Sequence, residues 1–221
     1  MPTRPDFATL EAAAQARHLT ILCALDRAAC ASSGGLDART GTLLLLSPVE
    51  PGFFIAFEAS KEFCDGLPDP LDRYTQRIVE PFAAEFGGTA YYPNDPTRPF
   101  LSWALGSGFA HSSPVGMLVR EDSGLWLSFR AALGLPHALD LPTPSPAPCP
   151  SCARPCLTAC PVGALTADGY DAALCKDWLR RPEGTDCLTR GCALRRSCPA
   201  GQDVPRLHRQ SEFHMRAFLE A

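Results

Sequence analysis

The stretch Cys149-Pro150-Ser151-Cys152-Ala153-Arg154-Pro155-Cys156-Leu157-Thr158-Ala159-Cys160-Pro161 brings four cysteines close together in the sequence. The chain has 221 residues and eleven cysteines, eight of which lie between Cys149 and Cys198. Residues 1–6 lack the basic and then apolar pattern of an export signal, so we expect a cytoplasmic protein, and disulfides rarely persist in that reducing compartment. Clustered thiols there are more often metal ligands. The stretch therefore predicts a metal site.

The spacing of these cysteines narrows the kind of site. The pattern C-x2-C-x3-C-x3-C-P is similar to the C-x2-C-x2-C-x3-C-P run of bacterial ferredoxins, in which the fourth cysteine binds the other of two clusters. A second group, Cys175, Cys187, Cys192 and Cys198-Pro199, also closes with Cys-Pro. Two such groups predict two [4Fe–4S] clusters with exchanged fourth ligands. We expect one cluster on Cys149, Cys152, Cys156 and Cys198, and the other on Cys160, Cys175, Cys187 and Cys192.

Two other interpretations of the eight thiols stay open. Two zinc sites of four cysteines would use the same number, and C-x2-C is common in zinc sites. Purely structural thiols are the third interpretation. The repeated Cys-Pro and the three-residue spacings favour a cubane cluster, whereas the extra residue before Cys156 and the wider later spacing depart from the ferredoxin pattern. The remaining cysteines, Cys23, Cys30 and Cys64, are expected to be small buried hydrophobic residues.

Five arginines lie between the later cysteines, and they allow two interpretations. Near a cluster they would stabilise its negative charge and raise its potential, whereas on the surface they would form a solvated face. These residues are Arg180, Arg181, Arg190, Arg195 and Arg196.

Charge and proline content divide the chain. Residues 1–148 contain 10 basic and 16 acidic residues, whereas residues 149–221 contain 10 basic and 8 acidic residues. Six of the fifteen residues from Pro136 to Pro150 are proline, which favours an extended, semi-rigid connection. We therefore expect an α+β domain over residues 1–140, a linker over 141–148, and an iron–sulfur domain over 149–221.

The first domain is expected to be an N-terminal sheet with flanking helices, joined to the small two-cluster ferredoxin-like module. Apolar periodicity predicts helices over 7–17, 51–63, 69–86 and 99–105. Asp69 is expected to cap the third of these, and Pro81 to kink or split it. Strands are predicted over 19–25, 42–46 and 89–92, and a hairpin is predicted to pair 115–119 with 125–129.

The cysteine module, over about residues 149–200, resembles the double-cluster domain of epoxyqueuosine reductases and reductive dehalogenases. In those families, too, a run closed by Cys-Pro is followed by a lone cysteine, here Cys175, and a final Cys-Pro. The resemblance implies an iron–sulfur oxidoreductase.

Residues 42–136 resemble the cobalamin-processing (CblC-type) proteins, which are related to the nitroreductase-like flavoprotein fold. The matching stretches are 68–74, 88–92 and 124–130. The resemblance implies that Tyr91 and Tyr92 line a corrinoid pocket and that Arg130 faces a thiol co-substrate. As ordinary residues, they would be strand-end aromatics and a surface arginine. Cobalamin, or else flavin, is the cofactor expected in this domain.

Together these features predict a redox protein that receives electrons from a donor protein and passes them to a corrinoid or another small molecule. The alternatives are a ferredoxin-like carrier or adaptor without catalysis, and a zinc-stabilised structural protein. A net charge of −4 argues against a general nucleic-acid binder. No apolar run reaches the ~18 residues of a membrane span.

Overall fold

The computed structural model describes residues 4–220, and its contacts divide the chain into two compact units. Unit 1 comprises the residues up to Ala110 together with Ser128–Pro144. Unit 2 comprises His111–Leu127 together with the residues from Ser145 onward. The segment His111–Leu127, which precedes the proline-rich stretch in the sequence, therefore packs with the cysteine module. The domain boundaries expected from the sequence remain a prediction.

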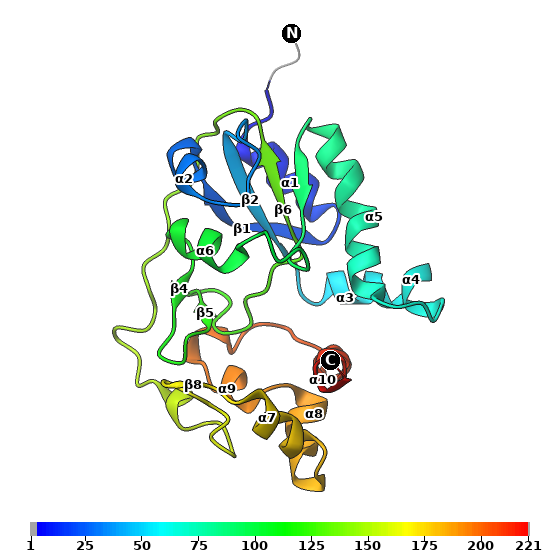
Figure 1. Cartoon of the computed structure of the whole chain (residues 1–221), viewed down its shortest axis with the longest axis vertical. Coiled ribbons are helices and arrows are strands. Elements are labelled where there is room, and N and C mark those ends of the chain that lie inside the picture. Colours follow the sequence, from blue (N-terminus) through cyan, green and yellow to red (C-terminus); the bar gives the residue numbers. More distant parts are fainter. Residues whose placement is uncertain (1–3, 221) are drawn as a thin grey trace. The chain divides into compact units, whose positions relative to one another are not determined.

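Unit 1 is built on an antiparallel sheet of order β1-β2-β6-β3 (Figure 1). Its strands are β1 (Leu19–Leu25), β2 (Thr42–Pro48), β3 (Thr89–Tyr91) and β6 (Ala131–Leu135). Strand β2 lies inside the sheet, with Leu43 paired to Leu25 on one side and to Gly134 on the other. Its four consecutive leucines, Leu43–Leu46, are fully buried, because both faces of this strand are covered.

Six helices of the described residues belong to unit 1. Helix α1 packs against β1, and α5 packs against β3 and β6 (Figure 1). The Asp6 carboxylate accepts a hydrogen bond from the Thr9 amide (2.8 Å) and so caps α1. The helices are α1 (Phe7–Gln15), α2 (Arg27–Ser32), α3 (Gly52–Glu58), α4 (Lys61–Cys64), α5 (Pro70–Glu85) and α6 (Phe100–Gly106).

The α+β class expected from the sequence is confirmed, with three local corrections. The helix predicted over 51–63 is two helices, because Ser60 accepts a hydrogen bond from the Phe63 amide and starts a new one. Asp69 does not cap α5: it adopts a left-handed conformation (φ 52°) and its side chain makes no cap hydrogen bond. Pro81 does not split α5, which continues through it to Glu85.

The predicted hairpin between 115–119 and 125–129 forms only as a single antiparallel bridge between Arg120 and Gly124, at the predicted turn. Strand β5 (Leu118–Val119) instead pairs back with β4 (His111–Ser112). An additional turn joins β4 to β5, because the Gly116 amide donates to the Ser113 carbonyl (3.0 Å) and Gly116 has φ +73°. The stretch 125–129 forms no strand, and the strand that follows it, β6, was not predicted. The apolar residues of 125–129 are buried although they form no strand; Leu125, for example, packs in the core of unit 2.

Unit 2 joins short elements around a small apolar core. That core contains Val115, Val119, Leu125, Leu194 and two cysteines, Cys156 and Cys198. Besides β4 and β5, the elements are η1 (Pro155–Leu157), β7 (Leu165–Thr166), β8 (Gly169–Tyr170), α7 (Ala172–Leu179), η2 (Pro182–Gly184), α8 (Thr185–Arg190), α9 (Ala193–Arg196), η3 (Pro199–Gly201) and α10 (His208–Glu220). The segment His111–Leu127 thus supplies three of the four buried apolar residues that surround the two cysteines.

A close backbone approach joins this segment to the last Cys-Pro. A Cβ atom at Gly124 would lie 2.5 Å from the Gly201 amide nitrogen and 3.1 Å from the Cys198 sulfur. Gly124 also has φ +53°, which disfavours other residues. Only glycine therefore allows the two segments to pack at this distance. None of the helices in residues 4–220 is long and apolar enough to cross a membrane.

We expect Gly124→Ala to destabilise unit 2, because the added methyl group collides with backbone atoms that have little room to move. Overpacking of this kind costs about 1–3 kcal/mol. Gly116→Ala is the matched control: Gly116 also has a positive φ, but a Cβ there meets nothing within 4 Å. Hydrogen–deuterium exchange of the 145–220 region measures the effect. Equal protection in the two variants would contradict this packing.

Candidate metal centre

The first cysteine loop is shaped by turns and by one hydrogen bond to sulfur. The Cys152 amide donates to the Cys149 carbonyl (3.2 Å) and forms the first turn. Arg154 adopts a left-handed conformation (φ 57°), and its amide donates to the Cys152 sulfur (3.3 Å). Pro155 then starts η1, which carries Cys156 into the core. A backbone amide directed at a sulfur is a device that stabilises thiolate ligands of clusters.

Cys198 joins this loop from a distant part of the sequence. It is buried with Cys156 in the core of unit 2. Together with Cys149 and Cys152 it lines a cavity of about 350 Å³. Burial raises the pKa of Cys149, and the nearby thiols of the other three raise it further. We call Cys149, Cys152, Cys156 and Cys198 the first cysteine set.

Four other cysteines also lie close enough together to raise the pKa of one of their thiols. Cys160 follows the first loop, Cys175 lies in α7, Cys187 lies in α8, and Cys192 precedes α9. Burial is the largest effect on the pKa of Cys175 and raises it, and the thiols of Cys192, Cys160 and Cys187 raise it further. We call these four the second cysteine set.

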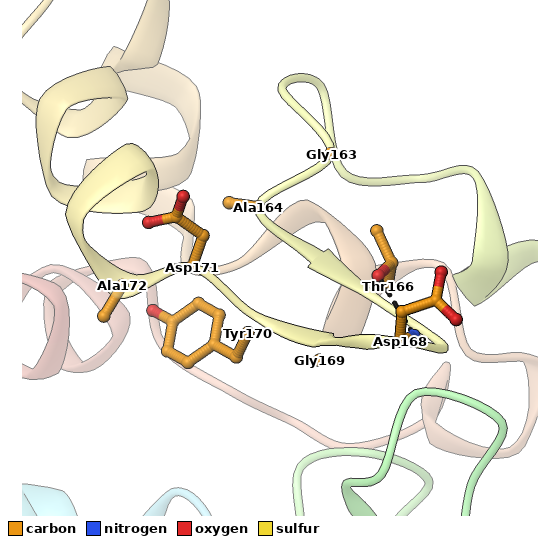
Figure 2. A pocket seen from close by; sticks show the side chains of 8 residues that line it. All are labelled: Gly163, Ala164, Thr166, Asp168, Gly169, Tyr170, Asp171 and Ala172. Carbon is orange, nitrogen blue, oxygen red and sulfur yellow. Dashed lines mark hydrogen bonds between the residues drawn. The ribbon is translucent and has the colours of Figure 1, made fainter.

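Tyr170 links the second set to the surface. Burial raises the pKa of the Cys175 thiol, and interaction with the Tyr170 side chain partly offsets that rise. Burial and then the interaction with Cys175 raise the pKa of Tyr170 itself. The tyrosine is nevertheless 50% exposed and lines an open pocket of about 530 Å³ between β7, β8 and the start of α7 (Figure 2). The polar side chains of this pocket include Thr166, Asp168 and Asp171.

The donor chemistry of both sets suits a soft metal group. Each set offers four thiols, the ligands that iron–sulfur clusters and zinc prefer. The raised pKa values of Cys149, Cys156 and Cys175 indicate partly buried thiols whose anionic forms repel one another. A positively charged group among them would remove that repulsion. Within residues 4–220, no three His, Cys, Asp or Glu side chains converge closely enough to hold a single metal ion.

The two tyrosines singled out in the N-terminal part have their hydroxyls engaged by protein groups. Tyr91 is buried, its ring is 5.9 Å from Trp103, and its hydroxyl accepts a hydrogen bond from the Asp37 amide (3.2 Å). The Tyr92 hydroxyl donates to Glu80 (2.8 Å). Burial, followed by the Glu80 carboxylate, raises the pKa of Tyr92.

Arg130 differs from the tyrosines, because its Nε–H group is buried and has no hydrogen-bond partner in the described part of the chain. Burial lowers its pKa, and the carboxylates of Asp72 and Glu50 oppose that shift. The residue lies just before β6, which pairs with β3 so that Tyr91 faces Ala132. The sheet therefore brings Arg130 and Tyr92 to the same end of two paired strands.

The remaining cysteines behave in two ways. Cys23 and Cys30 are buried in unit 1, as expected for small hydrophobic residues, whereas Cys64 is exposed at the end of α4. No pattern in the sequence indicated that Tyr170 would influence Cys175.

No family model matches the chain, and no solved structure matches it. The chain is similar to an epoxyqueuosine reductase of Vibrio cholerae serotype O1, with 26% identity over 191 residues. The match covers 72% of this chain and 50% of that protein. The chain therefore spans about half the length of the curated relative it matches. No comparison supports the expected resemblance of the N-terminal part to cobalamin-processing proteins.

Proposed function

We propose that this protein is an iron–sulfur oxidoreductase with one [4Fe–4S] cluster on the first cysteine set and one on the second. The observation that carries the proposal is the position of Cys198. It packs with Cys156 and lines the cavity with Cys149 and Cys152, although Cys187 and Cys192 are far closer in sequence. Exchange of the last cysteine between two groups is the arrangement of two-cluster ferredoxins. The similarity to a reductase supports an oxidoreductase in general.

The residues of unit 2 have separate tasks in this proposal. The eight cysteines supply thiolate ligands, and the clusters supply one-electron transfer. The Arg154 amide stabilises the Cys152 sulfur. Val119, Leu125 and Leu194 cover the first set with apolar groups and exclude water from it. We expect the electron donor to be another protein.

Anaerobic analysis of iron, acid-labile sulfide and zinc tests the proposal. We expect roughly eight iron atoms and eight sulfides per chain, because each [4Fe–4S] cluster contains four of each. Electron paramagnetic resonance after reduction should show two interacting signals. A colourless protein with about two zinc ions and no sulfide would overturn the proposal in favour of a zinc-stabilised structure.

The ligand assignment has its own test. We expect Cys198→Ala to lose about half of the iron and sulfide and to keep one cluster, because only the first set loses a ligand. Cys175→Ala should remove the other half. Cys64→Ala, at an exposed position outside both sets, is the control and should keep all the iron. Loss of the same signal in Cys198→Ala and Cys175→Ala would contradict the pairing.

We also propose that the N-terminal part binds a small molecule, with a corrinoid as the first candidate and a flavin as the second. The buried, unpartnered Nε–H of Arg130 supports a polar ligand at the end of β3 and β6. We expect cobalamin to bind at about one molecule per chain, and Arg130→Gln to weaken binding about tenfold, the loss of one charged hydrogen bond. Arg39→Gln, at an exposed residue, is the control.

Equilibrium dialysis with cobalamin and with flavin mononucleotide measures this binding. Iron-loaded protein that binds neither would support the alternative of an electron carrier or adaptor without catalysis. Equal binding by Arg130→Gln and the unchanged protein would remove Arg130 from the site.

A further inference from the structure

The two cysteine sets differ in how the chain brings their members together. Three members of the first set lie within the eight residues 149–156, where turns of the loop position them. The second set is spread over α7, α8 and two loops, with gaps of 14, 11 and 4 residues between its members. Closing longer stretches of chain costs more conformational entropy. The second set therefore depends more on tertiary contacts than the first.

Helix α10 supplies such contacts. It packs along α8, the helix that contains Cys187 (Figure 1). At the N-terminal end of α10, the buried Ser211 lies against Gly191, the residue before Cys192. A Cβ atom at Gly191 would lie 3.2 Å from the Ser211 Cβ. This end of α10 therefore rests on the turn that carries Cys192.

The other end of α10 reaches the stretch around Cys175. The Phe218 ring lies 6.2 Å from the ring of Tyr170, which precedes Cys175 by five residues. The Nζ atom of Lys176, the residue after Cys175, lies 5.2 Å from the centroid of the Phe218 ring. Ser211 and Phe218 are about two helical turns apart and so lie on the same side of α10. That side therefore contacts the stretches that carry three of the four cysteines of the second set.

The two ends of α10 differ in what else they hold. Arg206, just before the helix, lies over the Trp126 ring at 4.6 Å from its centroid. Trp126 also packs closely on Gly201, three residues after Cys198. The N-terminal end is thus linked to the first set as well. The contacts of Phe218 with β8 and α7 lie at the other end, so Phe218 is the side chain that probes the second set separately.

We propose that α10 is a clamp that holds the ligands of the second cluster together, with Phe218 as a positioning residue. The inference rests on the proposed function. Phe218 acts through Tyr170 and Lys176, which lie on either side of Cys175 in the sequence. Without its ring, the stretch that carries Cys175 loses an aromatic pair and a cation–π contact, so it separates from the other three cysteines more often. The first set keeps its own loop and is unaffected.

Release of iron to a ferrous chelator, bathophenanthroline disulfonate, tests this on the anaerobically loaded full-length protein. Cys175→Ala and Cys198→Ala each keep one cluster and therefore assign the two phases of release. In Phe218→Ala we expect the phase of the second set to be about tenfold faster, the equilibrium factor for losing both ring contacts, and the phase of the first set to stay the same. Phe218→Tyr keeps the ring and should release iron at nearly the original rate.

Two further variants complete the test. Arg216→Gln is the matched control, because Arg216 is exposed on the same helix and pairs with Glu212 within it. It should change neither phase. Lys176→Met removes the cation but keeps the aromatic pair, so we expect the phase of the second set to be about threefold faster.

The outcomes separate the two proposals. Unchanged protein without iron and sulfide would overturn the proposed function. Two clusters that release iron from Phe218→Ala at the original rates would overturn only this inference, as would equal acceleration of both phases. A Phe218→Ala protein that loads the first cluster and not the second would support the clamp. If Phe218→Ala loads neither, Lys176→Met decides, and an unchanged second-set phase in that variant would refute the clamp.

Discussion

Thiolates repel one another, and the fold of unit 2 brings eight potential thiolates into two partly buried groups. Cys149, Cys156 and Cys175 all have raised pKa values, with burial as the first cause and neighbouring thiols as a further one. Without a positive group, these thiols therefore hold their protons more tightly than thiols in water. A metal group that displaces the protons supplies the missing charge, so its binding free energy contributes directly to folding.

The rest of unit 2 is organised around this requirement. Its apolar core is small and comes from three separated stretches of the chain. Val119 and Leu125 lie in the first stretch, and Leu194 lies in the last. A core of this size provides limited stability by itself. The close contact between Gly124 and Gly201 lets the segment His111–Leu127 approach the last Cys-Pro closely enough to cover Cys198. The cover and the ligands are therefore parts of one structure, although more than twenty residues and a proline-rich stretch separate them in sequence.

The sequence predicted those secondary-structure elements that depend on local patterns of apolar residues. The strands over 19–25 and 42–46 and the α+β class are found in the structure because apolar runs of that length determine them. The hairpin shrinks to a single bridge because Leu125 is buried in the same core as Leu194 and not in a sheet, and a buried apolar run looks the same as a strand in the sequence. The hydrogen bond from Arg195 to the Leu125 carbonyl was hidden for the same reason, because it spans 70 residues.

Two sites with the same donors acquire different properties only through their surroundings. Both cysteine sets offer four thiols, so in a two-cluster protein the ligands themselves give electrons no preferred position. The first set receives a backbone amide from Arg154, which is fixed by the turn of the loop and does not depend on the side chain. At the second set, the side chain of the half-exposed Tyr170 influences the pKa of Cys175. Side chains can change by single substitutions while the ligand loop stays intact. The surroundings of each cysteine set can therefore change while its thiols stay in place.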